Sequence, residues 1–202
     1  MASEIKANKI SPATGTAITL GDSGDTFTVP SGVTLTNNGT ASGFGGGKVL
    51  QVVQATKGDT ASTTSRTAVT TGLEASITPS ATSSKVLVTV VFGYTCEADV
   101  NSVFQLWRDS TAIHLADAAG NRERASAASI YQASGGTANM YGGTINALDT
   151  PSSTSSITYK LMYFGGEGAN SNSIFFNRAE GDSDTDEFKR TISSITLMEI
   201  GA

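Results

Sequence analysis

The chain has 202 residues, of which 15% are charged and 22 are Gly, and its net charge is −5. Charged residues usually make up about a quarter of a globular chain, and the scarcity of strong helix formers favours short strands. An acidic chain without clustered Lys and Arg does not suit nucleic-acid binding, and no apolar run is long enough to span a membrane. The start, MASEIKANK, lacks the apolar run of a secretory signal, and the single Cys96 excludes an internal disulfide.

Residues 10–42 contain minimal strand patterns separated by turn residues. Three apolar-Thr-apolar clusters (ITL at 18–20, FTV at 27–29 and VTL at 33–35) show strand alternation at its shortest. Such short strands cannot offset their backbone ordering in a single chain. We therefore expect three copies to form a β-prism or triple-β neck, the alternative being a disordered linker. The predicted trimer neck core is Ile18, Leu20, Phe27, Val29, Val33 and Leu35.

The sequence GFGGGK separates this neck from a region of longer strands. Gly provides positive φ angles and flexibility, so residues 43–47 are predicted to form a glycine hinge. The chain is thus divided into an N-terminal segment (1–9), the neck (10–42), the hinge (43–47) and a domain (48–202).

The domain alternates in a strand pattern with turn clusters between the strands. In 84–95, one face carries Val86, Val88, Val90, Phe92 and Tyr94, and in 156–164 one face carries Ile157, Tyr159, Leu161 and Tyr163. Period-two patterning of this kind belongs to antiparallel sheets with one buried face. The expected fold is an all-β, jelly-roll-like sandwich, with a closed barrel as the alternative. The predicted strands are 49–56, 72–79, 84–95, 102–109, 111–117, 138–148, 156–164, 172–179 and 192–200.

Few residues suit catalysis or metal binding. The lone histidine, His114, fits an ordinary strand position, and Cys96 has no partner motif. No G-x-S-x-G nucleophile motif is present. The acidic run EGDSDTDE at 180–187 begins like a calcium loop but lacks the Gly and Glu of the EF-hand pattern, so a solvated turn is expected and a loose Ca²⁺ site is the alternative. We predict a protein that is not an enzyme and needs no cofactor or metal.

A binding surface is predicted in residues 116–142, which begin with the long irregular region 116–137. Long loops in compact domains are often functional, and exposed tyrosines can stack on sugar rings. The candidate contact residues are Arg122, Arg124, Tyr131 and Tyr141. Trp107 shares a strand face with Val103 and Gln105, opposite Phe104 and Leu106, so it is predicted to face outward as a subunit-interface candidate.

Several motifs resemble those of tail-fibre and virion structural proteins of marine bacteriophages. The stretch ISPATGTAITLGDSGDTFTVPSGVTLTNNGT resembles a repeat-like segment near the start of such proteins. KVLQVVQATKGDT, ITPSATSSKVLVTV, LWRDSTAIHLADAAGNRERA, LDTPSSTSSITYKLMY, FFNRAEGDSDTD and SSITLMEI follow in the same order. The resemblance covers most of the chain and supplies no catalytic motif.

The resemblance implies a homotrimeric tail or baseplate fibre that is assembled in the host cytoplasm and incorporated into the virion. Residues 1–9 would anchor the fibre to an adaptor, baseplate or capsid protein, and the sandwich would bind a host-surface glycan or protein. Two alternatives stay open: a head-decoration, spike or adaptor protein that binds other virion proteins, and a non-viral carbohydrate-binding module. Neither nucleic acid nor membrane insertion is expected.

Overall fold

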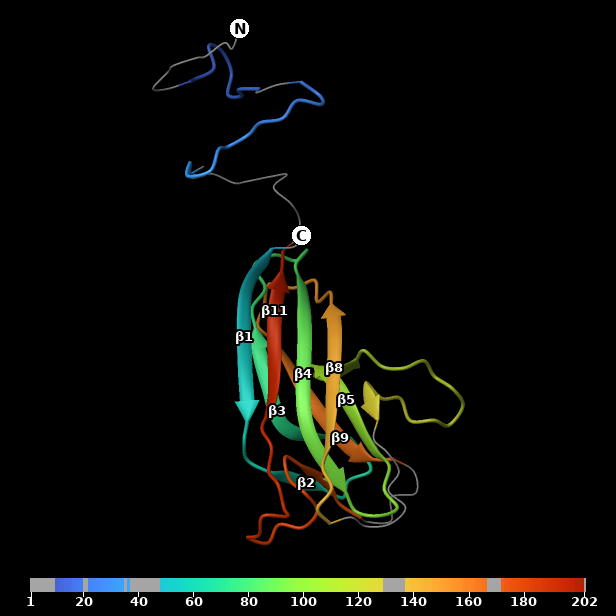
Figure 1. The fold of residues 1–202 in the computed structure, drawn as a ribbon. Helices are drawn as coiled ribbons and strands as arrows, with labels where there is room; N and C mark the ends of the chain where they lie inside the picture. The colour runs from blue at the N-terminus through green and yellow to red at the C-terminus, as the bar shows by residue number, and fades with distance from the viewer. Residues whose placement is uncertain are drawn as a thin grey trace. The chain divides into compact units, whose positions relative to one another are not determined.

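The computed structural model describes residues 10–19, 22–34, 36, 48–128, 137–166 and 172–201. The chain divides into two units, Met1–Phe44 and Gly45–Ala202. All strands of the described ranges belong to the second unit (Figure 1). Within those ranges, no helix has the length and hydrophobicity needed to cross a membrane.

The second unit is a sandwich of two antiparallel sheets, as the sequence predicts. Sheet A consists of β1 (Val49–Lys57), β11 (Ser193–Ile200), β4 (Lys85–Cys96), β10 (Ile174–Phe176), β2 (Ala61–Thr63) and β8 (Tyr141–Asp149). Sheet B consists of β3 (Val69–Ile77), β9 (Ile157–Gly165), β5 (Ser102–Arg108), β6 (Thr111–Ile113) and β7 (Ala127–Ala128).

Three strands of this sandwich are interrupted. β10 and β11 pair in turn with the same edge of β4, and a loop at 177–192 leaves the sheet between them. β6 and β7 likewise share one edge of β5, with a loop at 114–126 between them. β1 and β2 follow β11 and β10 with a short break at 58–60. Each pair is therefore one strand from which a loop is extruded.

With each interrupted pair counted once, the connectivity is that of a jelly roll. The first strand (β1/β2) pairs with the last (β11/β10), β3 pairs with β9, β4 with β8, and β5 with β6/β7. The chain is thus a long antiparallel hairpin rolled into two sheets, in the order β1-β11-β4-β8 and β3-β9-β5-β6. This confirms the predicted fold class.

The core lies between the sheets, where the alternating side chains of both inner faces meet. All the apolar residues predicted to share one face of β4 and one face of β9 are at most 5% exposed. Phe104 of β5 lies at the centre of an aromatic cluster, with its ring centroid 4.6 Å from that of Phe92 and 4.8 Å from that of Tyr94. The two sheets are therefore held together mainly by apolar and aromatic packing.

The described part of residues 10–42 contains turns and no strand. Two turns close where Asp25 N–H donates to Asp22 O (3.0 Å) and Val33 N–H donates to Pro30 O (3.2 Å). The predicted neck residues are exposed: Ile18 (44%), Phe27 (67%), Val29 (37%) and Val33 (59%). Leu20 and Leu35 lie outside the described residues. A prism needs further copies of the chain, so it stays a prediction.

Glu199 of β11 is a buried carboxylate at the end of sheet A that carries Lys48. It is 1% exposed and accepts hydrogen bonds from Ser80 N–H (2.7 Å), Ser80 Oγ (2.6 Å) and Gln51 Nε2 (2.6 Å). Burial alone would raise the pKa of Glu199, but the hydrogen bonds from Ser80 and Gln51 outweigh it and lower the pKa from 4.5 to about 2. The ionised carboxylate therefore ties β11 to the β3–β4 connection.

Glu199→Gln is expected to destabilise the sandwich by about 1.5–3 kcal/mol at pH 7. The neutral amide oxygen is a weaker acceptor than a carboxylate oxygen, and the amide NH2 group would face a donor where the second carboxylate oxygen accepts a hydrogen bond. Since folding lowers this pKa, the contribution is present above pH 4.5 and is lost as the pH falls towards 2. Urea unfolding at a series of pH values should show the difference between wild type and variant shrinking over that interval. Glu187→Gln in the exposed loop is the control, and a pH-independent difference would contradict this account of Glu199.

Candidate binding surfaces

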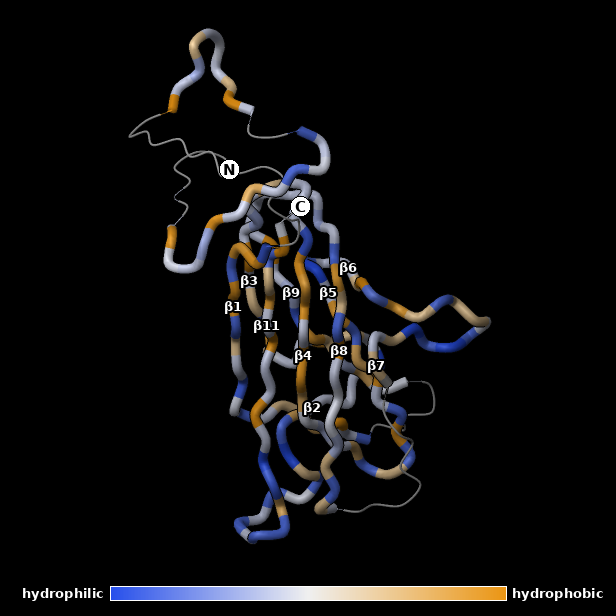
Figure 2. Tube along the Cα trace, turned by 45° about the horizontal axis from the view of Figure 1, so that its top comes forward, coloured by the Kyte–Doolittle hydropathy of each residue, from blue (hydrophilic) through white to orange (hydrophobic). Residues whose placement is uncertain are grey.

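The two long extruded loops are the main candidate binding surfaces of the sandwich. The loop at 177–192 lies at the end of the sandwich opposite Lys48 and the C-terminus, and the loop at 114–126 projects from its side (Figures 1 and 2). Both leave their strand at a residue in the left-handed region, His114 (φ 52°) and Asn177 (φ 61°). Asn and His tolerate this conformation better than most residues.

A serine closes each gap where the loop returns. The Ser126 hydroxyl accepts a hydrogen bond from Leu106 N–H (2.9 Å), and the Ser193 hydroxyl accepts one from Gly93 N–H (3.2 Å). Both N–H groups belong to the strand that spans the interruption. The serine oxygens thus replace missing ladder acceptors, and each loop can leave the sheet without an unpaired buried donor.

Asn177 fixes the base of the 177–192 loop. Its side chain is fully buried, and its Nδ2 donates to Lys57 O (2.7 Å) and Asp59 O (3.1 Å). Its Oδ1 accepts a short hydrogen bond from the Ser193 hydroxyl. Asn177 therefore joins the breaks in β1/β2 and β10/β11 into one polar network.

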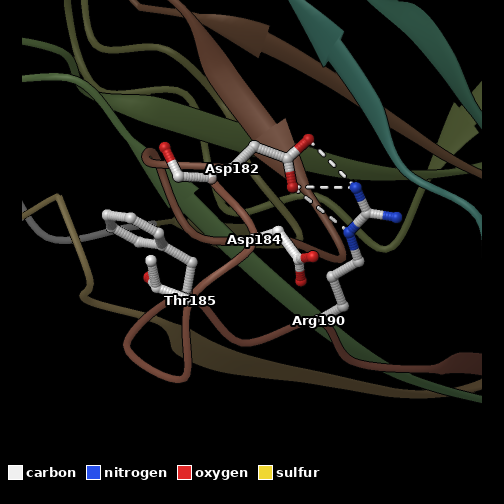
Figure 3. Close-up of a pocket in the computed structure, with 6 residues that line it drawn as sticks. Asp182, Asp184, Thr185 and Arg190 are labelled. Carbon is white, nitrogen blue, oxygen red and sulfur yellow. Dashed lines mark hydrogen bonds and ion pairs between the residues drawn. The ribbon is translucent and has the colours of Figure 1, made fainter.

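The tip of this loop carries the acidic run and a pocket of about 490 Å³ (Figure 3). Arg190 pairs with Asp182 across the pocket, with Nη2 at 2.9 Å from Oδ1. Both side chains are largely exposed (62% and 41%), so the pair adds little stability. No group of three His, Cys, Asp or Glu side chains able to hold a metal ion occurs among the described residues. The pocket is lined by Asp182, Ser183, Asp184, Thr185, Phe188 and Arg190.

The two predicted contact arginines have different positions in the side loop. Arg124 closes the loop, because its Nε donates to Ala116 O (2.6 Å) and its own carbonyl accepts from Gln105 Nε2 (2.7 Å). Arg122 is exposed and borders an open pocket of about 310 Å³. Amide, carboxylate and guanidinium groups gather there, a set that suits polar ligands such as sugars. The lining residues are Asn101, Val103, Asn121, Arg122, Glu123 and Gly166.

The predicted aromatic contact residues are spread over the molecule. Tyr141 begins β8 and packs half-buried against the core, with its ring centroid 5.9 Å from that of Tyr94. Trp107 lies half-buried on the outer face of sheet B, where its Nε1 donates to Gln105 Oε1 (3.0 Å). Tyr131 lies outside the described residues. Of the three described candidates, Arg122 and Arg124 share one loop and Tyr141 lies elsewhere, and the binding role of all four candidates stays a prediction.

Cys96 and His114, the two side chains considered for catalysis, lie in different environments. Cys96 is 1% exposed in the core, and burial raises the pKa of its thiol, which keeps it protonated. His114 is exposed and directly follows β6, which ends at Ile113 instead of continuing to 117 as predicted. The strand is shorter because His114 turns the chain out of the sheet.

Sequence reasoning missed Asn177 and the two gap-closing serines. Nothing in the local pattern distinguishes Ser193 from the many other Ser residues, because its role depends on the N–H of a distant strand. Asn177 follows a short apolar run and precedes a turn-rich segment, which is the one local signal for a left-handed residue at a strand end.

No family model matches the chain, and no curated protein matches its sequence. Among solved structures, the VP2 subviral particle of infectious bursal disease virus is similar over 75% of this chain and 41% of that one, with 13% identity and a TM-score of 0.35. The chain thus spans about two fifths of the length of that viral protein.

Proposed function

We propose that the chain is a virion structural protein: a homotrimeric tail or baseplate fibre with a jelly-roll head that binds the host surface. One observation carries the proposal: a complete sandwich is joined to a segment whose apolar side chains, such as Phe27 (67%) and Val33 (59%), are exposed in a single chain. The resemblance of its motifs to those of phage fibre proteins agrees with it.

In this proposal each region of the chain has a separate role. Residues 1–9 attach to an adaptor, baseplate or capsid protein, and the neck joins three chains. The extruded loops contact a host glycan or protein, with Arg122 at the side loop and the acidic tip at the far end of the sandwich. Three heads on one axis raise the strength of attachment, so each head can bind weakly.

Molar mass and particle location test the proposal together. Sedimentation of the full-length protein at micromolar concentration should give three times the chain mass, and antibodies should label tail fibres of the virus that encodes it in electron micrographs. A monomer would contradict the trimer and support a carbohydrate-binding module instead. Labelling of the capsid surface would support the decoration-protein alternative and contradict the fibre.

We further propose that the protein has no catalytic activity, on the basis of the buried Cys96 thiol and the position of His114 at a strand end. Incubation with a panel of host-surface glycans should release no product above the level of a buffer blank. Hydrolysis of any glycan, abolished by a substitution in one of the two loops, would contradict this.

A further inference from the structure

A row of apolar side chains crosses the outer face of sheet A near Lys48. Val52 of β1 lies opposite Met198 of β11. Leu87 of β4 lies between Met198 and Leu148 of β8. Directly opposite residues in antiparallel strands place their side chains on the same face, so the four residues form one continuous row. Figure 2 shows the apolar character of this end of β1 and β4.

This apolar row is exposed at its two ends and half-buried at its centre. Val52 is 56% exposed and Leu148 is 57% exposed. The next row along the sheet is polar and self-paired, with hydrogen bonds of 2.9 Å from Gln54 to Thr196 and from Thr89 to Asn146. Farther still, the Arg178 guanidinium covers the Phe175 ring at 3.9 Å. The apolar row has no such cover from the described residues.

The outer face of sheet A is also nearly free of charge. Lys85 is the one charged side chain among the described strand positions that face outward from β1, β11, β4 and β8. Exposed protein surfaces usually carry charge at about a quarter to a third of positions. Two copies of a chain with net charge −5 repel each other overall, so a contact between copies is favoured on a face without carboxylates.

The chain enters the sandwich beside this row. Gly201 N–H donates to Lys48 O (2.8 Å), which holds the first residue of the sandwich next to the end of β11. Chains joined through residues 10–42 would therefore be tethered at the end of sheet A that carries the row. A short tether raises the effective concentration of the tethered surfaces to about the millimolar range.

We infer that the apolar rows of three copies of this chain face the axis of the trimer and pack against one another there. The inference rests on the proposed homotrimer and names its contact surface in the head. A patch of this kind, on the order of a few hundred Å², is typical of interaction sites. It falls short of the roughly 800 Å² per partner of a stable independent interface, which is why the tether is needed.

Single cysteines placed in the row test the contact in the full-length chain. We choose Leu87→Cys and, separately, Met198→Cys, the two central residues of the row, treated with a short bismaleimide and analysed on denaturing gels. Cross-linked chains are expected for both variants, because the centre of the row lies closest to the axis, where equivalent residues of the three chains meet. Wild type should give none, since Cys96 is buried. The matched control is Ser76→Cys, on the outer face of sheet B, which should stay uncross-linked.

A charged residue introduced into the apolar row provides the second test, which measures the stability of the oligomer. Leu148→Glu should lower the temperature at which the oligomer dissociates, whereas Thr144→Glu, on the same face beyond the polar row, should leave it unchanged. A trimer that neither cross-links through the row nor responds to Leu148→Glu would overturn this inference and leave the proposed fibre intact. A monomeric wild-type chain would overturn both, and would assign the row to another partner.

Discussion

Replacing Asn177 by Ala is expected to reduce the free energy of unfolding of the sandwich by about 3–5 kcal/mol. The substitution removes the acceptor of the buried Ser193 hydroxyl and leaves the carbonyls of Lys57 and Asp59 without this donor. It also puts Ala at φ 61°, where the methyl group is strained and no side-chain hydrogen bond compensates. Urea unfolding monitored by tryptophan fluorescence measures the loss.

Two further variants separate the causes at this position. Asn177→Gly tolerates the left-handed backbone but cannot make the side-chain hydrogen bonds. Its free energy of unfolding should therefore fall almost as much as that of Asn177→Ala. Asn146→Ala removes one exposed hydrogen bond to Thr89 on the surface of sheet A and should cost less than about 0.5 kcal/mol. Equal effects of Asn177→Ala and Asn146→Ala would refute the role given to Asn177.

Asp149→Ala is expected to destabilise the sandwich by about 2–4 kcal/mol. Asp149 ends β8 in sheet A, and it receives hydrogen bonds from two residues of sheet B, Arg108 Nη1 (2.9 Å) and the Tyr159 hydroxyl (2.7 Å). The Arg108 and Asp149 side chains are 30% and 15% exposed, so removing the carboxylate leaves a partly buried guanidinium and a buried hydroxyl unpaired. Asp149→Asn should lose less, because an amide oxygen still accepts from Tyr159.

The same cluster predicts the stability of the protein in alkali. Burial, and then the Asp149 carboxylate, raise the pKa of Tyr159 well above 10, and burial raises the pKa of Tyr163 to about 12. Because folding raises these pKa values, their contribution is fully present below pH 10 and is lost as the pH rises beyond it. Unfolding midpoints should be constant up to pH 10 and then fall. Titration of these tyrosines at pH 10 in the folded protein would contradict the prediction.

The alternation of long strands was sufficient to predict most of the fold. In β4 and β9 every second residue is a large apolar one, and these residues are the core. β2 and β7 were missed because strands of three and two residues carry no period, and they exist only as continuations of β1 and β6 along a neighbour. An irregular segment was predicted at 116–137 and a turn at 180–187, but the origin of the loops at 114–126 and 177–192 within a strand depends on pairings distant in sequence.

The binding candidates show where a local pattern is ambiguous. Tyr141 precedes Gly142 and Gly143, which suggested an exposed glycine-rich tip. In the structure these residues belong to β8, and a Cβ at Gly143 would lie 2.2 Å from Cζ of Phe92. Gly143 is thus needed for the packing of an aromatic ring, and Tyr141 packs beside it. The apolar row was equally hidden, because its members come from four separate strands.

The pairing of the first strand with the last determines when this protein can fold during synthesis. β11 lies between β1 and β4, so residues 193–200 must leave the ribosome before sheet A can close. Until then the apolar β4 lacks a neighbour on one side, and nascent chains on one messenger are exposed to mispairing with each other. Slow closure of sheet A, late in the synthesis of the sandwich, follows from this contact pattern. Expression at low temperature, or with chaperones that hold nascent chains, should accordingly increase the yield of native protein.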